Sequence, residues 1–297
     1  MDLLAPSSVG ALCALGSAFT WAVTSLLART IHPTLTFVAI NAIRSTVAGV
    51  LVVGWVVAVE GVGALTSISA TTFWLLAFSI TIAVGIGDNL FFESSRTVGL
   101  ARSMTIAMTY PLITTVLAAL ILDERITARV VIGALLTLAG ILLIVMGRPH
   151  AAETRHEHYW RGVAAASLAS LAWGVSPLMM KAPLEEMSAA AAQGVRLPVA
   201  AAVLWVTPWT RGAVGALVTS GRTVMTRMAA LSVLTVFSSV LYVAGIKYTG
   251  VAIGSILSSV APMFAIPLGI IFLGERLSLA AILGVLVTIV GVAVLQL

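Results

Sequence analysis

The chain has 297 residues, of which 60% are hydrophobic and only 9% are charged. An ordinary soluble protein is about 25% charged, so this chain has too few charges to cover a surface that faces water. The net charge is +5, but the basic residues stand singly between apolar runs, which excludes the basic patch of a nucleic-acid-binding protein. The composition predicts an integral membrane protein.

Apolar runs that are long enough to cross a membrane follow one another along the chain. A spanning helix needs about 20 apolar residues, so the length accommodates ten helices with short connections. The first five helices are predicted at 9–28, 36–58, 72–95, 99–122 and 129–147. The second five are predicted at 161–180, 188–207, 228–246, 250–273 and 278–296. We expect an all-α protein with one unit at 1–147, a polar linker at 148–160 and a second unit at 161–297.

The two sets of five helices are copies of each other. An offset of 152 residues places Gly10 on Gly162 and Trp21 on Trp173. From Gly99 onwards the offset becomes 151, and it superposes a proline, a Glu-Arg pair and three glycines on identical residues. Because five is an odd number, the second copy must enter the membrane from the opposite side. Inverted repeats are the usual architecture of secondary transporters. A duplicated scaffold without transport is the alternative.

Two arginines lie deep within predicted helices. Arg44 and its repeat partner Arg196 each lie about 12 Å along a helix, at 1.5 Å per residue. Asn41 and Gln193 precede them by three residues and therefore share their helical faces. A cation at this depth usually faces a cavity or a partner, so each copy presents an amide and a guanidinium inward. A substrate site and a structural tie to backbone carbonyls are equally compatible with this pattern.

The buried acids are found in one copy only. Asp88 lies within the third predicted helix, and its repeat partner is Ser239, so the scaffold does not require this carboxylate. Asp88 could pair with Arg44, bind a substrate ammonium or exchange a proton during transport. Glu93 also has no acidic repeat partner and is a second candidate for proton coupling, although it could simply pair with Arg96 three residues later.

Aromatic residues supply a second set of candidates. Trp21 and Trp173 occupy matching positions in the first helix of each copy, where they could pack the repeats together or form the wall of a substrate cavity. Tyr110 and Tyr242 place hydroxyl groups at membrane depth. These four residues are therefore candidate substrate-binding residues, together with the arginines, their amide neighbours and Asp88.

Prolines mark the fourth helix of each copy. Pro111 and Pro262 each remove a backbone hydrogen bond, and we expect a kink in both helices at these positions. Kinked helices beside a cavity suit gating, although such prolines also occur in static bundles.

Signatures of enzymes, metal sites and nucleotide sites are missing from the sequence. It contains no glycine-rich phosphate loop ending in Lys-Ser or Lys-Thr and no Gly-x-Ser-x-Gly. His150, His156 and His158 lie in the polar linker without cysteine support, so they read as a solvated connector. We therefore expect no enzyme activity, no cofactor, no metal ion and no nucleic-acid partner.

Two motifs carry a family resemblance. Leu-Asp-Glu-Arg at 122–125 is repeated as Leu-Gly-Glu-Arg at 273–276, and each precedes a last helix with small residues at matched positions. With ten helices in two copies and a proline in each fourth helix, the chain resembles the EamA-type branch of the drug/metabolite transporter superfamily. The resemblance implies that the first four helices of each copy surround the substrate and that the fifth packs at the periphery. It also implies transport of amino acids, related metabolites, drugs, sugars or nucleotide sugars.

The sequence thus predicts a multi-pass secondary transporter in the cell membrane, the cytoplasmic membrane if the cell is prokaryotic. We expect efflux of small metabolites such as amino acids, by alternating access and with possible proton coupling. The alternatives are a sugar-phosphate or nucleotide-sugar carrier, which two central arginines would suit, and a scaffold that does not transport. The expected partners are a small-molecule substrate and the lipid bilayer, and the expected state is a monomer or homodimer.

Overall fold

The structure is a computed structural model, and it describes residues 5–31, 34–98, 103, 106–146, 159–261, 263–264, 268 and 278–296. The described part is helical. The first half contains α1 (Pro6–Ile31), α2 (Phe37–Val59), α3 (Gly63–Thr66), α4 (Ala70–Ile80), the π-helix η1 (Thr81–Asp88), α5 (Asn89–Thr97), α7 (Tyr110–Ile121) and α8 (Ala128–Met146). The second half contains α9 (Tyr159–Val175), η3 (Ser176–Met180), α10 (Lys181–Glu186), α11 (Ala189–Trp205), η4 (Pro208–Thr210), α12 (Ala213–Thr219), α13 (Arg222–Thr249), α14 (Val251–Ser258) and α16 (Leu279–Gln296).

Five helical rods in the described part are long and apolar enough to cross a membrane. They cover Pro6–Ala28, Phe37–Val59, Ala70–Phe91, Tyr159–Glu186 and Arg222–Thr249. A sixth would consist of Ala189–Trp205 with Pro208–Thr219, two segments that meet at 88°. Three shorter apolar helices cover Tyr110–Ile121, Ala128–Ile144 and Ile282–Leu295. The chain is therefore an all-helical, multi-pass membrane protein, whereas the number of ten spans stays a prediction.

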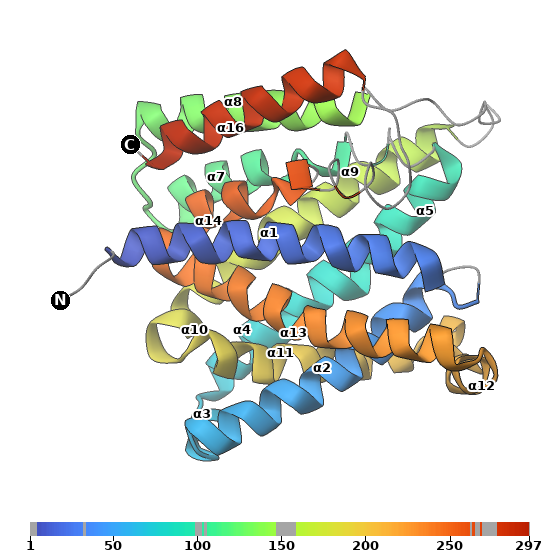
Figure 1. Cartoon of the computed structure of the whole chain (residues 1–297). Coiled ribbons are helices and arrows are strands. Elements are labelled where there is room, and N and C mark those ends of the chain that lie inside the picture. Colours follow the sequence, from blue (N-terminus) through green and yellow to red (C-terminus); the bar gives the residue numbers. More distant parts are fainter. Residues whose placement is uncertain are drawn as a thin grey trace.

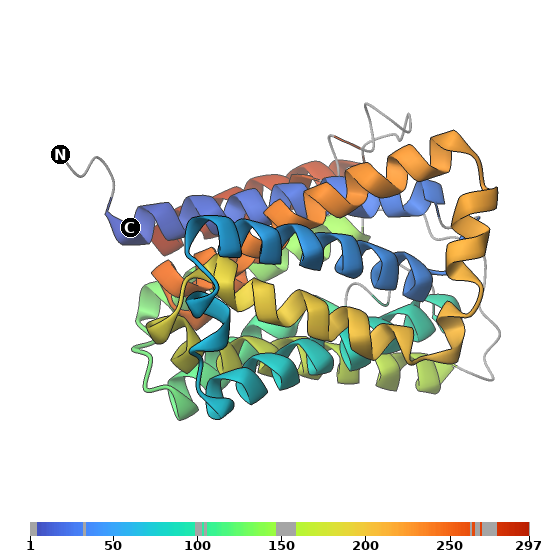
Figure 2. The same ribbon diagram turned by 90° about the horizontal axis from the view of Figure 1, so that it is seen from below.

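The helices form one bundle in which α1 begins and α16 ends at the same end (Figure 1). The short helix α12 crosses the opposite end of the bundle and joins α11 to α13 (Figure 2). The linker histidines at 150, 156 and 158 lie outside the described residues.

Helix pairing in the bundle repeats when the two halves are exchanged. α1 packs along α13, and α9 packs along η1 and α5, which are the corresponding elements of the other half. α2 packs on its repeat partner α11, and α7 packs on α14. α8 and α16 pair with each other at one edge of the bundle, as Figure 1 shows. The fifth helix of each half is thus peripheral, as the family resemblance implied.

Small residues allow the closest of these helix contacts. A Cβ on Gly10 would lie 2.7 Å from Tyr248 Cβ, and one on Gly162 would clash with the Thr97 side chain at the equivalent place. In the peripheral pair, a Cβ on Gly140 would lie 2.5 Å from Thr288 N. Close backbone approach of this kind is how helices associate in lipid, where the hydrophobic effect between them is absent.

Pro111 does not kink a continuous helix, contrary to the prediction for 99–122. The helix α7 begins at Tyr110 with Pro111 in its first turn, and a turn at 108–109 precedes it. Proline is well tolerated there because the N–H that it lacks would have no partner within the helix. A turn at 259–260 follows α14 at the repeat-related position. Pro262 lies outside the described residues.

The Glu-Arg turn of the first half stabilises a helix of the second half. Glu124 Oε1 accepts a hydrogen bond from Val251 N at 2.8 Å, and Oε2 accepts one from Ala252 N at 3.1 Å. These are free N–H groups at the start of α14, where a negative charge is favourable. Gly250 precedes them with φ of +88°, a conformation that favours glycine. Glu124 therefore links the two halves by hydrogen bonds.

Candidate functional site

A cavity of about 230 Å³ lies between the two halves of the bundle. Its walls come from α1, α2, η1 and α7 of the first half and from α9, α11, α13 and α14 of the second. Eight of the nine predicted substrate-binding residues line it: Trp21, Arg44, Asp88, Tyr110, Trp173, Gln193, Arg196 and Tyr242. The ninth, Asn41, lies next to the wall and binds Asp88. The structure thus brings together residues that are up to 221 positions apart in the sequence.

Asp88 lies at the end of η1 and is held by hydrogen bonds from both halves of the chain. Its Oδ1 accepts a bond from the Trp173 indole N–H at 3.1 Å, and its Oδ2 accepts one from Asn41 Nδ2 at 3.3 Å. The same indole N–H also lies 3.1 Å from the carbonyl of Ala83. The side chain is 8% exposed, and it has no ion pair within the described part of the chain. The pairing with Arg44 that the sequence left open is therefore not formed.

The π-helix that carries Asp88 accounts for the change of repeat offset. The offset is 152 up to Arg44 and 151 from Gly99, so the first half has one extra residue in between. The buried residues Leu76 and Ser79 of α4 match the buried Met228 and Leu231 at the offset of 152. The surplus residue therefore falls within η1, whereas α13 is an unbroken α-helix. Single-turn π insertions of this kind are frequent at functional sites.

Arg196 is fixed in place by neighbouring protein groups. Its Nε donates to Ser79 Oγ at 3.0 Å, and its Nη1 donates to Gln193 Oε1 at 3.3 Å. Gln193 in turn donates to the Ser239 carbonyl at 2.9 Å. Arg196 is 3% exposed, so water cannot bind its guanidinium, and these protein groups take the place of water as hydrogen-bond partners. Arg196 links α11 to α4 and, through Gln193, to α13.

Arg44 has a different environment from its repeat partner. Its guanidinium carbon lies 5.2 Å from the centre of the Trp21 ring, a distance typical of a cation–π contact. Its Nε is buried and has no hydrogen-bond partner. The two arginines that the sequence treats as equivalent are therefore inequivalent in the structure.

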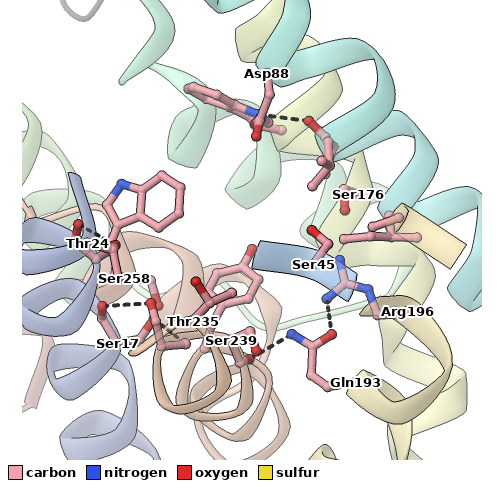
Figure 3. A pocket seen from close by; sticks show the side chains of 18 of the residues that line it. Ser17, Thr24, Ser45, Asp88, Ser176, Gln193, Arg196, Thr235, Ser239 and Ser258 are labelled. Carbon is pink, nitrogen blue, oxygen red and sulfur yellow. Dashed lines mark hydrogen bonds between the residues drawn. The ribbon is translucent and has the colours of Figure 1, made fainter. Parts of the chain in front are cut away.

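Figure 3 shows how the polar groups are distributed around the cavity. Asp88 lies on one wall, Arg196 and Gln193 lie on another, and Ser17 and Thr24 of α1 lie on a third. Aromatic rings complete the walls: Tyr110 meets Trp173 edge to face, with ring centres 6.2 Å apart. The Tyr110 hydroxyl donates to the Ser255 carbonyl at 3.3 Å.

Hydroxyl side chains on the wall are the part of the site that the sequence did not predict. They include Ser45, Thr235, Ser238 and Ser259. Ser238 belongs to a reciprocal contact between α1 and α13, in which Ser17 Oγ donates to the Ser238 carbonyl at 2.9 Å. Serine and threonine are common in membrane helices as packing residues, so composition alone does not distinguish those that face a cavity. A signal was available for Ser45 and Ser238, which lie one helical turn from the predicted site residues Asn41 and Tyr242.

Glu93, the second candidate for proton coupling, lies outside the cavity. Its carboxylate forms an ion pair with Arg161 at 2.9 Å, and the two side chains are 36% and 69% exposed. This pair links α5 to α9 near the end of the bundle. Arg96, the partner that the sequence offered, has a side chain outside the described part.

Comparison with known proteins agrees with this architecture. The family model described as "EamA-like transporter family" matches the chain twice, at residues 8–146 and 160–297. A solved structure entitled "Crystal structure of protein" is similar over 97% of this chain and 96% of its own, with a TM-score of 0.78 and 20% sequence identity, which shows a shared fold. A search of curated proteins finds no match.

The two matches of the family model together cover nearly the whole chain, one in each half of the bundle. They agree with the internal repeat in the sequence and with the peripheral pairing of α8 and α16. The chain therefore belongs to the EamA-like transporter family, within the drug/metabolite transporter superfamily, and is a membrane transporter of that type.

Proposed function

We propose that the chain is a secondary transporter that exports small metabolites, amino acids or related compounds, across the cell membrane. The observation that carries this proposal is the cavity between the halves, whose walls contain Asp88 and both Arg44 and Arg196. A zwitterion needs one anionic and one cationic protein group, and these residues supply both. The proposed transporter is a monomer or homodimer, since residues from both halves of one chain line the cavity.

Transport would proceed by rocking of two inverted five-helix repeats about the cavity. Pairing that repeats when the halves are exchanged supports this mechanism, because two such halves can adopt two equivalent arrangements that open on opposite sides. The turns at 108–109 and 259–260 interrupt the fourth helix of each repeat beside the cavity. They are suitable places for the helices to bend during the change.

Proton coupling would act through Asp88. Its two oxygens accept bonds from Asn41 of the first repeat and Trp173 of the second. A carboxylate is a stronger acceptor than a carboxylic acid, so protonation would weaken both bonds, including the one that joins the repeats. Protonation would thereby favour separation of η1 from α9. Glu93 lies in an exposed ion pair away from the cavity and is not needed for this step.

The two alternatives make different demands on the cavity. A sugar-phosphate carrier would use both arginines for the phosphate group, but Arg196 already donates to Ser79 and Gln193. A scaffold would be expected to have a filled centre with Asp88 paired to an arginine. Asp88 has neutral N–H donors instead and borders an open volume. We therefore favour export of a zwitterion.

Counterflow tests the proposal directly. Purified protein is placed in liposomes loaded with a mixed metabolite extract, and exchanged species are identified by mass spectrometry. Selective exchange of a few zwitterionic compounds is the expected result. Absence of exchange by protein that is folded and inserted in both orientations would contradict transport, and exchange restricted to phosphorylated sugars would favour the alternative carrier.

A further inference from the structure

The two arginines of the cavity differ in how many protein groups they bind. Arg196 donates through Nε to Ser79 and through Nη1 to Gln193. Arg44 Nε is buried and donates to nothing, and no hydrogen bond from its other nitrogens is found in the described part of the chain. A buried guanidinium nitrogen without a partner is costly, so native structures retain one only where something else satisfies it.

The sequence explains why Arg44 lacks the partners that Arg196 has. Ser79, which accepts from Arg196 Nε, corresponds at the offset of 152 to Leu231, and both are fully buried. Leucine offers no acceptor. Gln193 corresponds to Asn41, whose shorter amide binds Asp88 and forms no hydrogen bond with the neighbouring guanidinium in the described part of the chain. These two differences between the repeats leave Arg44 without an acceptor among the described residues.

Asp88 does not supply the missing partner, although it borders the same cavity. Its Oδ1 is occupied by Trp173 and its Oδ2 by Asn41, and it forms no ion pair with Arg44. The Trp21 ring lies 5.2 Å from the guanidinium carbon and offers no oxygen or nitrogen acceptor, so the N–H groups of Arg44 still need hydrogen-bond partners. The edge of a guanidinium is matched to a planar anion that accepts two parallel bonds, which is the geometry of a carboxylate.

We propose that Arg44 binds the carboxylate of the cargo and that Arg196 is a positioning residue, which holds α11 against α4 through Ser79. This assignment rests on the proposed function, since it names the chemical group recognised in the same cavity. It divides roles between two residues that the repeat makes equivalent. It also requires only one anionic group on the cargo, because Arg44 alone of the two cavity arginines has no hydrogen-bond acceptor among the described residues.

The test compares counterflow of two forms of one metabolite extract, untreated and with its carboxyl groups converted to amides. With the native protein, the untreated extract should compete for exchange at least tenfold better than the amidated one. Arg44→Gln should lose exchange at least tenfold with a Tm close to that of the native protein, and Arg44→Lys should keep an intermediate rate. Arg161→Gln, at a 69% exposed arginine, is the matched control and should exchange normally.

Arg196→Gln should behave differently from Arg44→Gln. Its Tm should fall without any cargo, and the exchange that remains should keep the preference for the untreated extract. Folded Arg44→Gln protein that exchanges at the native rate would overturn the assignment, as would an amidated extract that competes as well as the untreated one. Both results leave transport itself intact. Absence of exchange by the native protein would instead contradict the proposed function, and the assignment with it.

Discussion

The peripheral pair α8 and α16 and the walls of the cavity are both built from repeat-related residues. In the pair these residues are the same in both halves, whereas around the cavity some of them differ. In the pair, Gly140 approaches Thr288 and Gly284 while Gly291 approaches Thr137, so each contact has its counterpart in the other half. At the cavity, some repeat-related positions differ: Asp88 corresponds to Ser239, both on the wall, and Ser79, which binds the wall residue Arg196, corresponds to Leu231.

The comparison separates residues that hold the bundle from residues that act on cargo. Packing benefits from symmetry because both halves must fit the same interface, and small matched residues provide that fit. A cargo molecule is itself asymmetric and presents different groups to the two repeats. Departures from the repeat inside the cavity therefore mark candidate functional residues more sharply than the matched residues do.

The largest effect is expected when the symmetric interface is broken. Gly140→Val would place a Cβ 2.5 Å from Thr288 N and 2.6 Å from Gly284 O, backbone atoms that no rotamer change can move away. Overpacking of this kind costs about 3 kcal/mol, which corresponds to a fall in Tm of about 10 °C. Gly54→Val is the control, since nothing lies within 4 Å of the Cβ position. Thermal unfolding in detergent measures both, and equal Tm values would show that the peripheral contact is not needed.

The second effect concerns the asymmetric acid. Asp88→Asn should abolish transport driven by a pH gradient but reduce cargo exchange at equal pH much less, because asparagine keeps the size of the side chain and an oxygen acceptor for the cargo but has no proton to exchange. Asp88→Ser, which installs the residue found at the repeat partner, should likewise abolish gradient-driven transport. Uptake into liposomes with and without a gradient distinguishes the two activities. Equal loss of both activities would mean that Asp88 acts only in cargo binding or in holding the fold, without a role in proton coupling.

The matched tryptophans provide a finer comparison. Trp173→Phe removes the N–H that bonds Asp88 and Ala83, and a hydrogen bond to a charged group is worth about 1.5–3 kcal/mol, so gradient-driven transport should fall about tenfold. Trp21→Phe keeps an aromatic ring under Arg44, and transport should change about twofold at most. Initial rates of gradient-driven transport by the two variants decide this, and equal losses would remove the distinction between them.

The smallest effect is expected at the exposed ion pair. Glu93→Gln breaks the contact with Arg161, and a pair this exposed contributes roughly 0–1 kcal/mol. The Tm should move by about 2 °C or less, and gradient-driven transport should be unchanged. Loss of gradient coupling in this variant would make Glu93 a proton carrier after all.

Much of the fold could be predicted from the sequence because a membrane helix requires a long run of apolar residues, which is visible in the sequence. The predicted helix at 36–58 corresponds to α2 at Phe37–Val59, and the predicted helix at 278–296 corresponds to α16 at Leu279–Gln296. The interruption at 108–109 was not predicted, because proline at a helix start and proline at a kink give the same local sequence.

Candidate site residues could be predicted because charge at membrane depth is costly and therefore rare. Asp88, Arg44 and Arg196 all line the cavity for this reason. What each arginine binds could not be predicted, since it depends on Ser79 for Arg196 and on Leu231 for Arg44, residues more than a hundred positions away in the sequence. The extra residue within η1 was visible as a change of offset, but only the structure locates it next to Asp88.

The central claim is that the cavity opens to each side of the membrane in turn. Cysteine labelling tests this directly in a Cys13→Ser background, which removes the single native cysteine. The variant is Ser239→Cys, at the cavity residue that corresponds to Asp88 in the second repeat. Right-side-out and inside-out vesicles that contain it are treated with a membrane-impermeant thiol reagent. The account predicts labelling from both faces, slowed by cargo in each case. Labelling from one face only, or from neither, would contradict it.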